Sequence, residues 1–208
     1  MRVILSSTLL VLAAAAAIMV SAHAEVRSVD AFNAVEARGR FKVEVATGPQ
    51  SVEITGDDAQ RLAARVHGDE LVISVIDRPL FGAEPEIDAV VHVTAPAITS
   101  LQASRGAEVQ ADGMRAEDFN ADASMGGILK VAGNCHRLET AASMGGQVDA
   151  GALNCAQVHA SASMGGAIRA TARNTVDASA SMGGAVAISG APAQRETHAS
   201  MGGDISFD

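Results

Sequence analysis

Residues 158–170 read VHASASMGGAIRA, and this stretch carries the pattern that decides the fold. Apolar and polar residues alternate before the methionine and again after the two glycines, and a period of two is typical of a β-strand. The glycine pair between the two strands permits backbone angles that only glycine reaches at little cost. The stretch therefore predicts a strand, a tight corner and a second strand.

The corner tetrapeptide Ser-Met-Gly-Gly recurs through the C-terminal half of the chain at intervals of 19, 20, 18 and 19 residues. Its copies begin at Ser124, Ser143, Ser163, Ser181 and Ser200. A degenerate copy, residues 104–107 (SRGA), lies 20 residues before the first. This period is too short for a strand–helix repeat that returns parallel. We therefore expect an all-β, single-domain parallel β-helix (a β-solenoid), right-handed, with about six short coils over residues 101–208.

The N-terminal half, residues 25–100, lacks the tetrapeptide but contains strand patterns such as residues 41–45 (FKVEV) and 71–75 (LVISV). We expect these strands to continue the sheets and to cap the first coil, because an open solenoid exposes its core and unpaired backbone. Residues 57–64 are expected to form one short helix. Trp and Tyr are absent and Phe occurs only five times, so aliphatic residues and Met must build the core.

The first residues have the composition of a secretory leader. Arg2 precedes an apolar run over residues 3–20, and residues 22–24 (AHA) match the small-x-small pattern that signal peptidase accepts. We expect a signal peptide over residues 1–24, a mature domain over residues 25–208, and a periplasmic, extracellular or cell-surface location. A retained membrane anchor is the alternative interpretation.

Without this leader the chain carries a net charge near −10 when its histidines are neutral. Such a surface repels nucleic acid and anionic lipid, so neither is expected as a partner. No later segment is long and apolar enough to form a membrane-spanning helix, so the processed chain is not expected to cross a membrane.

Several stretches together are similar to those of a known family. They are residues 32–35 (FNAV), the strands at residues 41–45 and 71–73, and the glycine-rich coils. Over residues 29–207 the chain resembles the head GIN domain family of putative auto-transporter adhesins, a domain of unknown function. The resemblance implies a β-helical fold, a secreted or envelope location in bacteria and no established activity. An adhesin-like role is implied by analogy with the family.

The outward position four residues before each tetrapeptide carries many of the ionisable groups of the coils. It holds Asn120, Glu139, His159, Asp177 and Glu196. With the coils in register, His159 lies about 4.8 Å from both Glu139 and Asp177, and we call these three residues the charge ladder. A salt-bridged row, a pH-sensitive histidine and a weak metal site are all compatible with it. A solvated strand face is the favoured interpretation.

Parallel β-helices include polysaccharide lyases and glycosidases, whose sites need clustered carboxylates and usually aromatic platforms for sugar rings. This chain has no Trp or Tyr, and no serine lies in a nucleophile-elbow pattern. We therefore expect no catalytic residue and no enzyme activity. A carbohydrate-active β-helix enzyme is the alternative.

No metal or other cofactor is expected. The histidines outside the charge ladder show no metal-ligand spacing, and the two cysteines do not form a C-x-x-C pair. The corner methionines offer thioethers, which bind soft metals such as copper. The strand phase places them on the inward side with Val158 and Ile168, so we expect them to fill the core. They are Met125, Met144, Met164, Met182 and Met201.

Two cysteines occupy nearly equivalent places in adjacent coils. Cys135 follows Ser124 by 11 residues, and Cys155 follows Ser143 by 12. Stacked strands bring such Cα atoms within the separation that a disulfide accepts, and export supplies an oxidising compartment. We expect a Cys135–Cys155 disulfide, with two buried free thiols as the alternative.

The serines that open the five tetrapeptides are expected to form an outward strip of small side chains, the serine strip. Its members are Ser124, Ser143, Ser163, Ser181 and Ser200, beside Ala141, Ser161 and Ser179. Charge is expected mainly at its ends, at Asp122 and His198. Such a strip lacks the long charged side chains that discourage association, and we hypothesise that it is a docking or self-association face. Passive duplication of serine with the repeat is the alternative.

Together these features predict an exported, non-catalytic envelope or cell-surface β-helix module, adhesin-like, that presents a rigid face to a macromolecular partner. The alternatives are the carbohydrate-active enzyme and a purely structural envelope or stress-related component.

Overall fold

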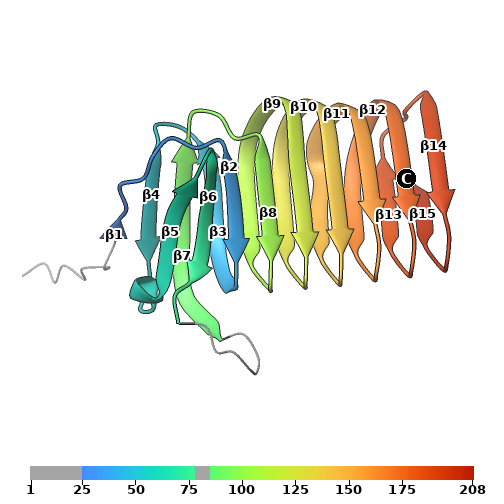
Figure 1. Ribbon diagram of the computed structural model, residues 1–208. Helices are drawn as coiled ribbons and strands as arrows, with labels where there is room; N and C mark the ends of the chain where they lie inside the picture. The colour runs from blue at the N-terminus through green and yellow to red at the C-terminus, as the bar shows by residue number, and fades with distance from the viewer. Residues whose placement is uncertain (1–24, 78–84) are drawn as a thin grey trace, which may run out of the picture.

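The computed structural model describes residues 25–77 and 85–208, which form a two-sided β-solenoid (Figure 1). The fold predicted from the repeat, an all-β single-domain solenoid, is confirmed. The predicted signal peptide, residues 1–24, lies outside the described residues. The strands are β1 (Glu25–Val26), β2 (Ala34–Arg38), β3 (Arg40–Thr47), β4 (Ser51–Thr55), β5 (Leu62–His67), β6 (Glu70–Val75), β7 (Glu86–Ala95), β8 (Ser100–Ser104), β9 (Glu108–Ser124), β10 (Ile128–Ser143), β11 (Gln147–Ala162), β12 (Ala167–Ala180), β13 (Ala185–Ser189), β14 (Gln194–Ala199) and β15 (Asp204–Phe207).

Each of β9 to β12 is one long strand that runs along one face of the solenoid, bends, and returns along the other. Neighbouring long strands pair in parallel, with a register shift at the bend, for example between Lys130 and Ala132. Strands β3 and β13 pair with first halves of this stack, whereas β8 and β14 pair with second halves. We call the face formed by β8, the second halves of β9 to β12, and β14 the front face; it is turned to the viewer in Figure 1.

The core is a narrow layer of small aliphatic side chains between the two faces. Along the second half of β11, Val158, Ala160 and Ala162 are buried while His159 is exposed. The same alternation continues through β12, where Val176 and Ala178 are fully buried. Because a strand side chain points to alternate faces, this period keeps one continuous apolar row in every coil.

The N-terminal strands continue both faces, as expected from their patterns. β2 lies between β6 and β8, and β3 lies between β7 and β9, all in parallel. Antiparallel strands then close this end, with β5 beside β6 on one face and β4 and β1 beyond β7 on the other. The short helix expected over residues 57–64 is only a three-residue 3-10 turn, Ala59–Arg61, because Leu62 already begins β5. Among the described residues, no helix is long and apolar enough to span a membrane.

The Ser-Met-Gly-Gly corners are tight turns with positive φ at both central residues. In the corner that follows β11, Met164 has φ 47° and Gly165 has φ 73°. The Gly166 N–H donates to the Ser163 carbonyl oxygen at 2.9 Å, which closes the turn. Two positive φ values and this hydrogen bond are the features of a type I′ turn. With the equivalent corner at Arg105, six such corners bound a stack of about five turns.

The corner methionines are not in the core, so that expectation is wrong. Met125, Met144, Met164 and Met182 are 43%, 49%, 47% and 49% exposed, and Met201 is 78% exposed. The strand alternation ends at the serine before each methionine, and the left-handed backbone of the turn then directs the next side chain away from the core. A non-glycine residue in this conformation costs roughly 1–2 kcal/mol, and Asn or Gly is the usual choice there.

The second glycine of each corner lies directly against the backbone of the preceding coil. A Cβ built on Gly166 would lie 2.2 Å from the Ala142 carbonyl oxygen, and the equivalent distance at Gly146 is 2.3 Å from Ala123. No real Cβ approaches a backbone atom this closely, so only glycine fits there. The first glycine differs, because a Cβ on Gly165 would meet no atom within 4 Å.

We predict that Gly166→Ala lowers the free energy of unfolding by about 3 kcal/mol or more, because coils β10 to β12 must separate to admit the methyl group. Gly165→Ala, in the same corner, should cost only about 1 kcal/mol, the penalty of a left-handed alanine in open space. Denaturant unfolding of the two variants measures both values. Equal losses would show that the close contact between Gly166 and the Ala142 carbonyl group is not what requires glycine there.

Candidate functional site

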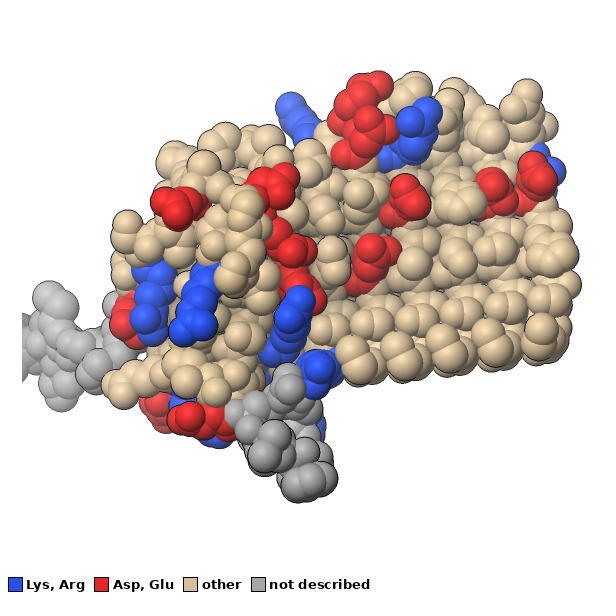
Figure 2. Space-filling view, in the orientation of Figure 1, with Lys and Arg blue, Asp and Glu red and all other residues tan. Residues whose placement is uncertain are grey.

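The front face carries three outward columns of side chains that run across the coils. The first contains the charge ladder, where the register pairs Glu139 with His159 and His159 with Asp177. The second column, two residues further along each strand, runs Gln102, Asp122, Ala141, Ser161, Ser179 and His198. The third column contains the serine strip. In Figure 2 the charged residues over the coils lie mainly in the upper rows, and the rows along the lower edge are uncharged apart from a basic side chain at their left end.

Within the charge ladder, His159 contacts one of its two acidic neighbours. Its Nδ1 lies 3.0 Å from Oδ2 of Asp177, and the two side chains are 51% and 48% exposed. Exposed ion pairs of this kind stabilise a fold by at most about 1 kcal/mol. Within residues 25–77 and 85–208, no group of three or more His, Cys, Asp or Glu is arranged to hold a metal ion. The ladder therefore has the geometry of a solvated strand face.

The serine strip is continuous across the coils. Register pairs join Ser104 to Ser124 and Ser124 to Ser143. Further along, the Ser163 N–H donates to the Ala142 carbonyl oxygen and the Ser181 N–H to that of Ala162, both at 2.9 Å. All five serines of the strip are half-buried, since the neighbouring columns and the corner flank them. A partner that lies on this strip can therefore approach the backbone of five consecutive coils.

One end of the second column contains a half-buried carboxylate, Asp122. Its Oδ1 accepts a hydrogen bond from the Ala141 N–H at 3.0 Å. Burial raises the pKa of the Asp122 carboxyl, and the negative charge of Glu139 adds to the rise, while the hydrogen bond from Ala141 opposes it. Asp122 lines a pocket of about 280 Å³ with Glu36 and Arg38 of β2, which form an ion pair with each other.

We predict that Asp122→Asn stabilises the protein at neutral pH, because the amide avoids burial of a charge and its oxygen still accepts from the Ala141 N–H. A carboxyl whose pKa is raised by folding destabilises the folded state when ionised. The advantage of the variant should therefore shrink as pH falls through the raised pKa and vanish below the ordinary value of 3.8. Thermal unfolding from pH 7 to pH 3 measures it, with exposed Asp204→Asn as the control for lost charge. A stability difference that does not change with pH would contradict this account.

A groove lined by residues of β3, β7 and the start of β9 brings several carboxylates together, which is the feature that a carbohydrate-active enzyme requires. It has a volume of about 570 Å³ and is lined in part by Asp58, Glu86, Asp88 and Glu108. Glu86 pairs with Arg40 at 3.2 Å, and Glu108 pairs with Lys130 at 3.4 Å.

The Asp58 carboxylate in this groove is also engaged by its neighbours. It accepts hydrogen bonds from the Asp88 N–H and from Arg61, which lower its pKa. A general acid needs a raised pKa, so the environment of Asp58 opposes that role. The four Phe residues that the structure describes are buried or half-buried, and none offers an open platform for a sugar ring.

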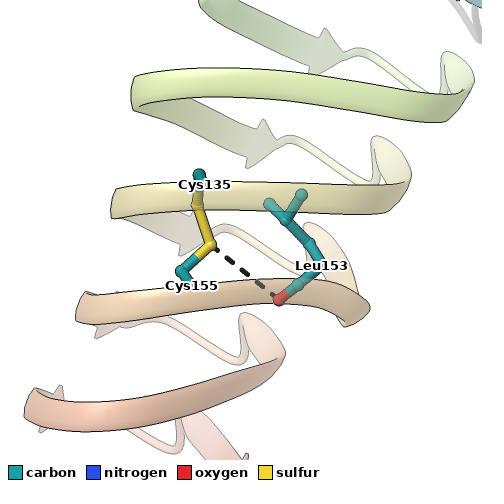
Figure 3. The surroundings of a disulfide bond; sticks show 3 residues. All are labelled: Cys135, Leu153 and Cys155. Atoms are coloured by element: carbon teal, nitrogen blue, oxygen red, sulfur yellow. Dashed lines mark hydrogen bonds between the residues drawn. A yellow bond between two sulfur atoms is a disulfide. The ribbon is translucent and has the colours of Figure 1, made fainter.

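Cys135 and Cys155 lie inside the solenoid, in register on β10 and β11. Their sulfur atoms are bonded across the two coils, with the Cα atoms 4.6 Å apart (Figure 3). Cys155 is fully buried and Cys135 almost so, and Sγ of Cys155 lies 3.8 Å from the Leu153 carbonyl oxygen. The bond is therefore shielded from solvent reductants.

We predict that the unfolded, unreduced protein contains no titratable thiol. Cys135→Ala/Cys155→Ala should lower the free energy of unfolding by about 3 kcal/mol, because the bond closes a loop of 20 residues in the unfolded chain. Denaturant unfolding with and without reductant measures the loss. Reductant should not alter the double variant, which serves as the control. Two free sulfhydryls in the unfolded, unreduced protein would refute the bond.

Comparison with known proteins agrees with this architecture. The family model described as "putative auto-transporter adhesin, head GIN domain" matches residues 31–192, most of the chain. The protein therefore belongs to this family, as the sequence resemblance indicated. No curated protein matches the chain significantly.

Two solved structures share the fold. A putative adhesin from Bacteroides fragilis is 16% identical, with a TM-score of 0.71 over 89% of this chain and 96% of the other. A putative adhesin from Parabacteroides merdae is 12% identical, with a TM-score of 0.50 over 89% of this chain and 95% of the other. At these identities the similarity concerns the fold alone.

Proposed function

We propose that the protein is an exported, non-catalytic envelope or cell-surface module that binds a macromolecular partner through the serine strip. The observation that carries this proposal is the strip itself: five half-buried serines in register on the front face, with uncharged neighbours between Asp122 and His198. Long charged side chains protect most exposed sheets from association, and here they are replaced by small ones.

The stiffness of the strip supports this role. Ser124 and Ser143 end β9 and β10, and the other three serines directly follow β11, β12 and β14. The backbone N–H of each of these three serines donates to the preceding coil at 2.9 Å, so binding requires little ordering of the face. The adhesin names of the family and of the solved relatives also support a surface role and an exported location. The Ala and Ser side chains allow a partner to contact the sheet closely, as extended chains and flat repetitive surfaces require.

We predict that Ser143→Lys/Ser163→Lys/Ser181→Lys abolishes binding while leaving the core intact. Three like charges on adjacent coils place long solvated side chains where the partner must approach, and we expect at least a tenfold loss. The assay is quantitative retention on immobilised bacterial envelope fractions and on whole cells, together with size-exclusion chromatography for self-association.

The matched control is Gln147→Lys/Ala167→Lys/Ala185→Lys. These residues are in register on the same three coils, beyond the corner on the other face, and add the same charge. Equal binding by parent, strip variant and control would exclude the serine strip. Absence of binding by all three proteins would instead favour a purely structural envelope component.

A further inference from the structure

The five corner methionines form one column along the lower edge of the solenoid, next to the serine strip. Their φ values lie between 45° and 49°, so their side chains leave the backbone in nearly the same direction. The Gly145 N–H donates to the Met164 carbonyl oxygen of the next coil at 3.2 Å, and the same bond links Gly165 to Met182. We call this row the methionine column: Met125, Met144, Met164, Met182 and Met201.

A corner methionine is less exposed where a further corner follows it. The four methionines that have a following corner are 43–49% exposed, whereas Met201, which has none, is 78% exposed. Stacked corners repeat at the strand spacing of about 4.8 Å. The side chain of Met has three rotatable bonds, so sulfur atoms from two or three consecutive corners can reach a single point.

Neither the turn nor the core accounts for methionine at this position. A type I′ turn favours Asn, Asp or Gly at its first central residue, and the side chain does not enter the core. What methionine contributes there is an exposed thioether, repeated in all five Ser-Met-Gly-Gly corners. Strained residues that persist at such positions are the kind of outlier from which a functional role is inferred.

We propose that the methionine column binds monovalent copper, Cu(I), through thioethers of adjacent coils. Thioether sulfur is a soft ligand that selects Cu(I), whereas Mg²⁺ and Ca²⁺ require oxygen ligands. The corners that contain Met144, Met164 and Met182 carry no charged residue, and neutral sulfur ligands suit a monovalent ion there. The negative net charge of the protein raises the local concentration of cations around it. The central site uses Met144, Met164 and Met182, and the inference does not depend on the proposed adhesive role.

The test is competition for Cu(I) between the full chain and a chromophoric Cu(I) chelator, with ascorbate present to keep copper reduced. The unmodified protein is expected to withdraw at least one equivalent of copper. Met144→Asn/Met164→Asn/Met182→Asn should bind at least tenfold more weakly. Asn is chosen because it tolerates the left-handed conformation, so this variant should unfold at the same or a higher temperature than the parent.

One control tests the imidazoles as ligands, and a second sulfur-free variant guards against misfolding of the first. His159→Asn/His198→Asn removes the imidazoles of the front face and should leave copper binding unchanged. Met144→Leu/Met164→Leu/Met182→Leu removes sulfur at constant volume, so it replaces the Asn variant should that variant fail to fold.

A second measurement identifies the ligands directly. In protein with ¹³C-labelled methionine methyl groups, Ag(I), a redox-inert substitute for Cu(I), should shift the signals of the corner methionines. Met114 is 1% exposed in the core and should not respond. The proposal is overturned if the parent takes no copper from the chelator, if the sulfur-free variants bind as the parent does, or if Met114 responds as strongly as the corners. In a protein that takes no copper, loss of partner binding by the Asn variant but not by the Leu variant would show that the column is an apolar contact instead.

Discussion

Every coil rests on the contact between the second glycine of its corner and a carbonyl group of the coil before it. At Gly127, Gly146, Gly166, Gly184 and Gly203 a Cβ would lie 2.2–2.4 Å from that oxygen. This approach sets the distance between successive corners, and the corners in turn hold the parallel strands in register along both faces. The register then aligns equivalent residues into columns, so the serine strip, the charge ladder and the methionine column all follow from a single steric constraint repeated along the chain.

The alternation of residues before each tetrapeptide was sufficient to predict the solenoid and its inward residues, because a strand keeps its period for as long as it remains extended. The same strand phase gives the wrong side for the methionine that follows each serine. At Met164 the backbone turns left-handed, so the phase of the strand no longer applies. A serine followed by three residues that end in two glycines has the spacing of a type I′ turn, and that signal would have placed methionine outside. The pocket around Asp122 was beyond sequence reasoning, since Glu36 and Arg38, which line it too, precede Asp122 by more than 80 positions.

The front face changes in chemistry from one column to the next. The charge ladder lies in the second halves of β10, β11 and β12. Small hydroxyl and methyl groups follow towards the corner, where the thioethers lie. A large partner and a soft metal ion would therefore use adjoining columns of the same coils without sharing a side chain. In the groove at the N-terminal end, Glu86, Asp58 and Glu108 pair with Arg40, Arg61 and Lys130. The strands at that end close the stack. Both proposed binding surfaces thus lie on the repeated coils.

The disulfide has a mechanical consequence for the solenoid under tension. A solenoid in which each coil touches only its neighbours peels from its end under tension, and a coil of about 19 residues releases roughly 60 Å of chain as it detaches. Peeling from the C-terminus would pass through β15, β14, β13 and β12 in small steps that absorb work. It would then reach the Cys135–Cys155 bond, which withholds 20 residues, about 70 Å, from extension. The bond between β10 and β11 is therefore a stop that limits how far the module lengthens under load.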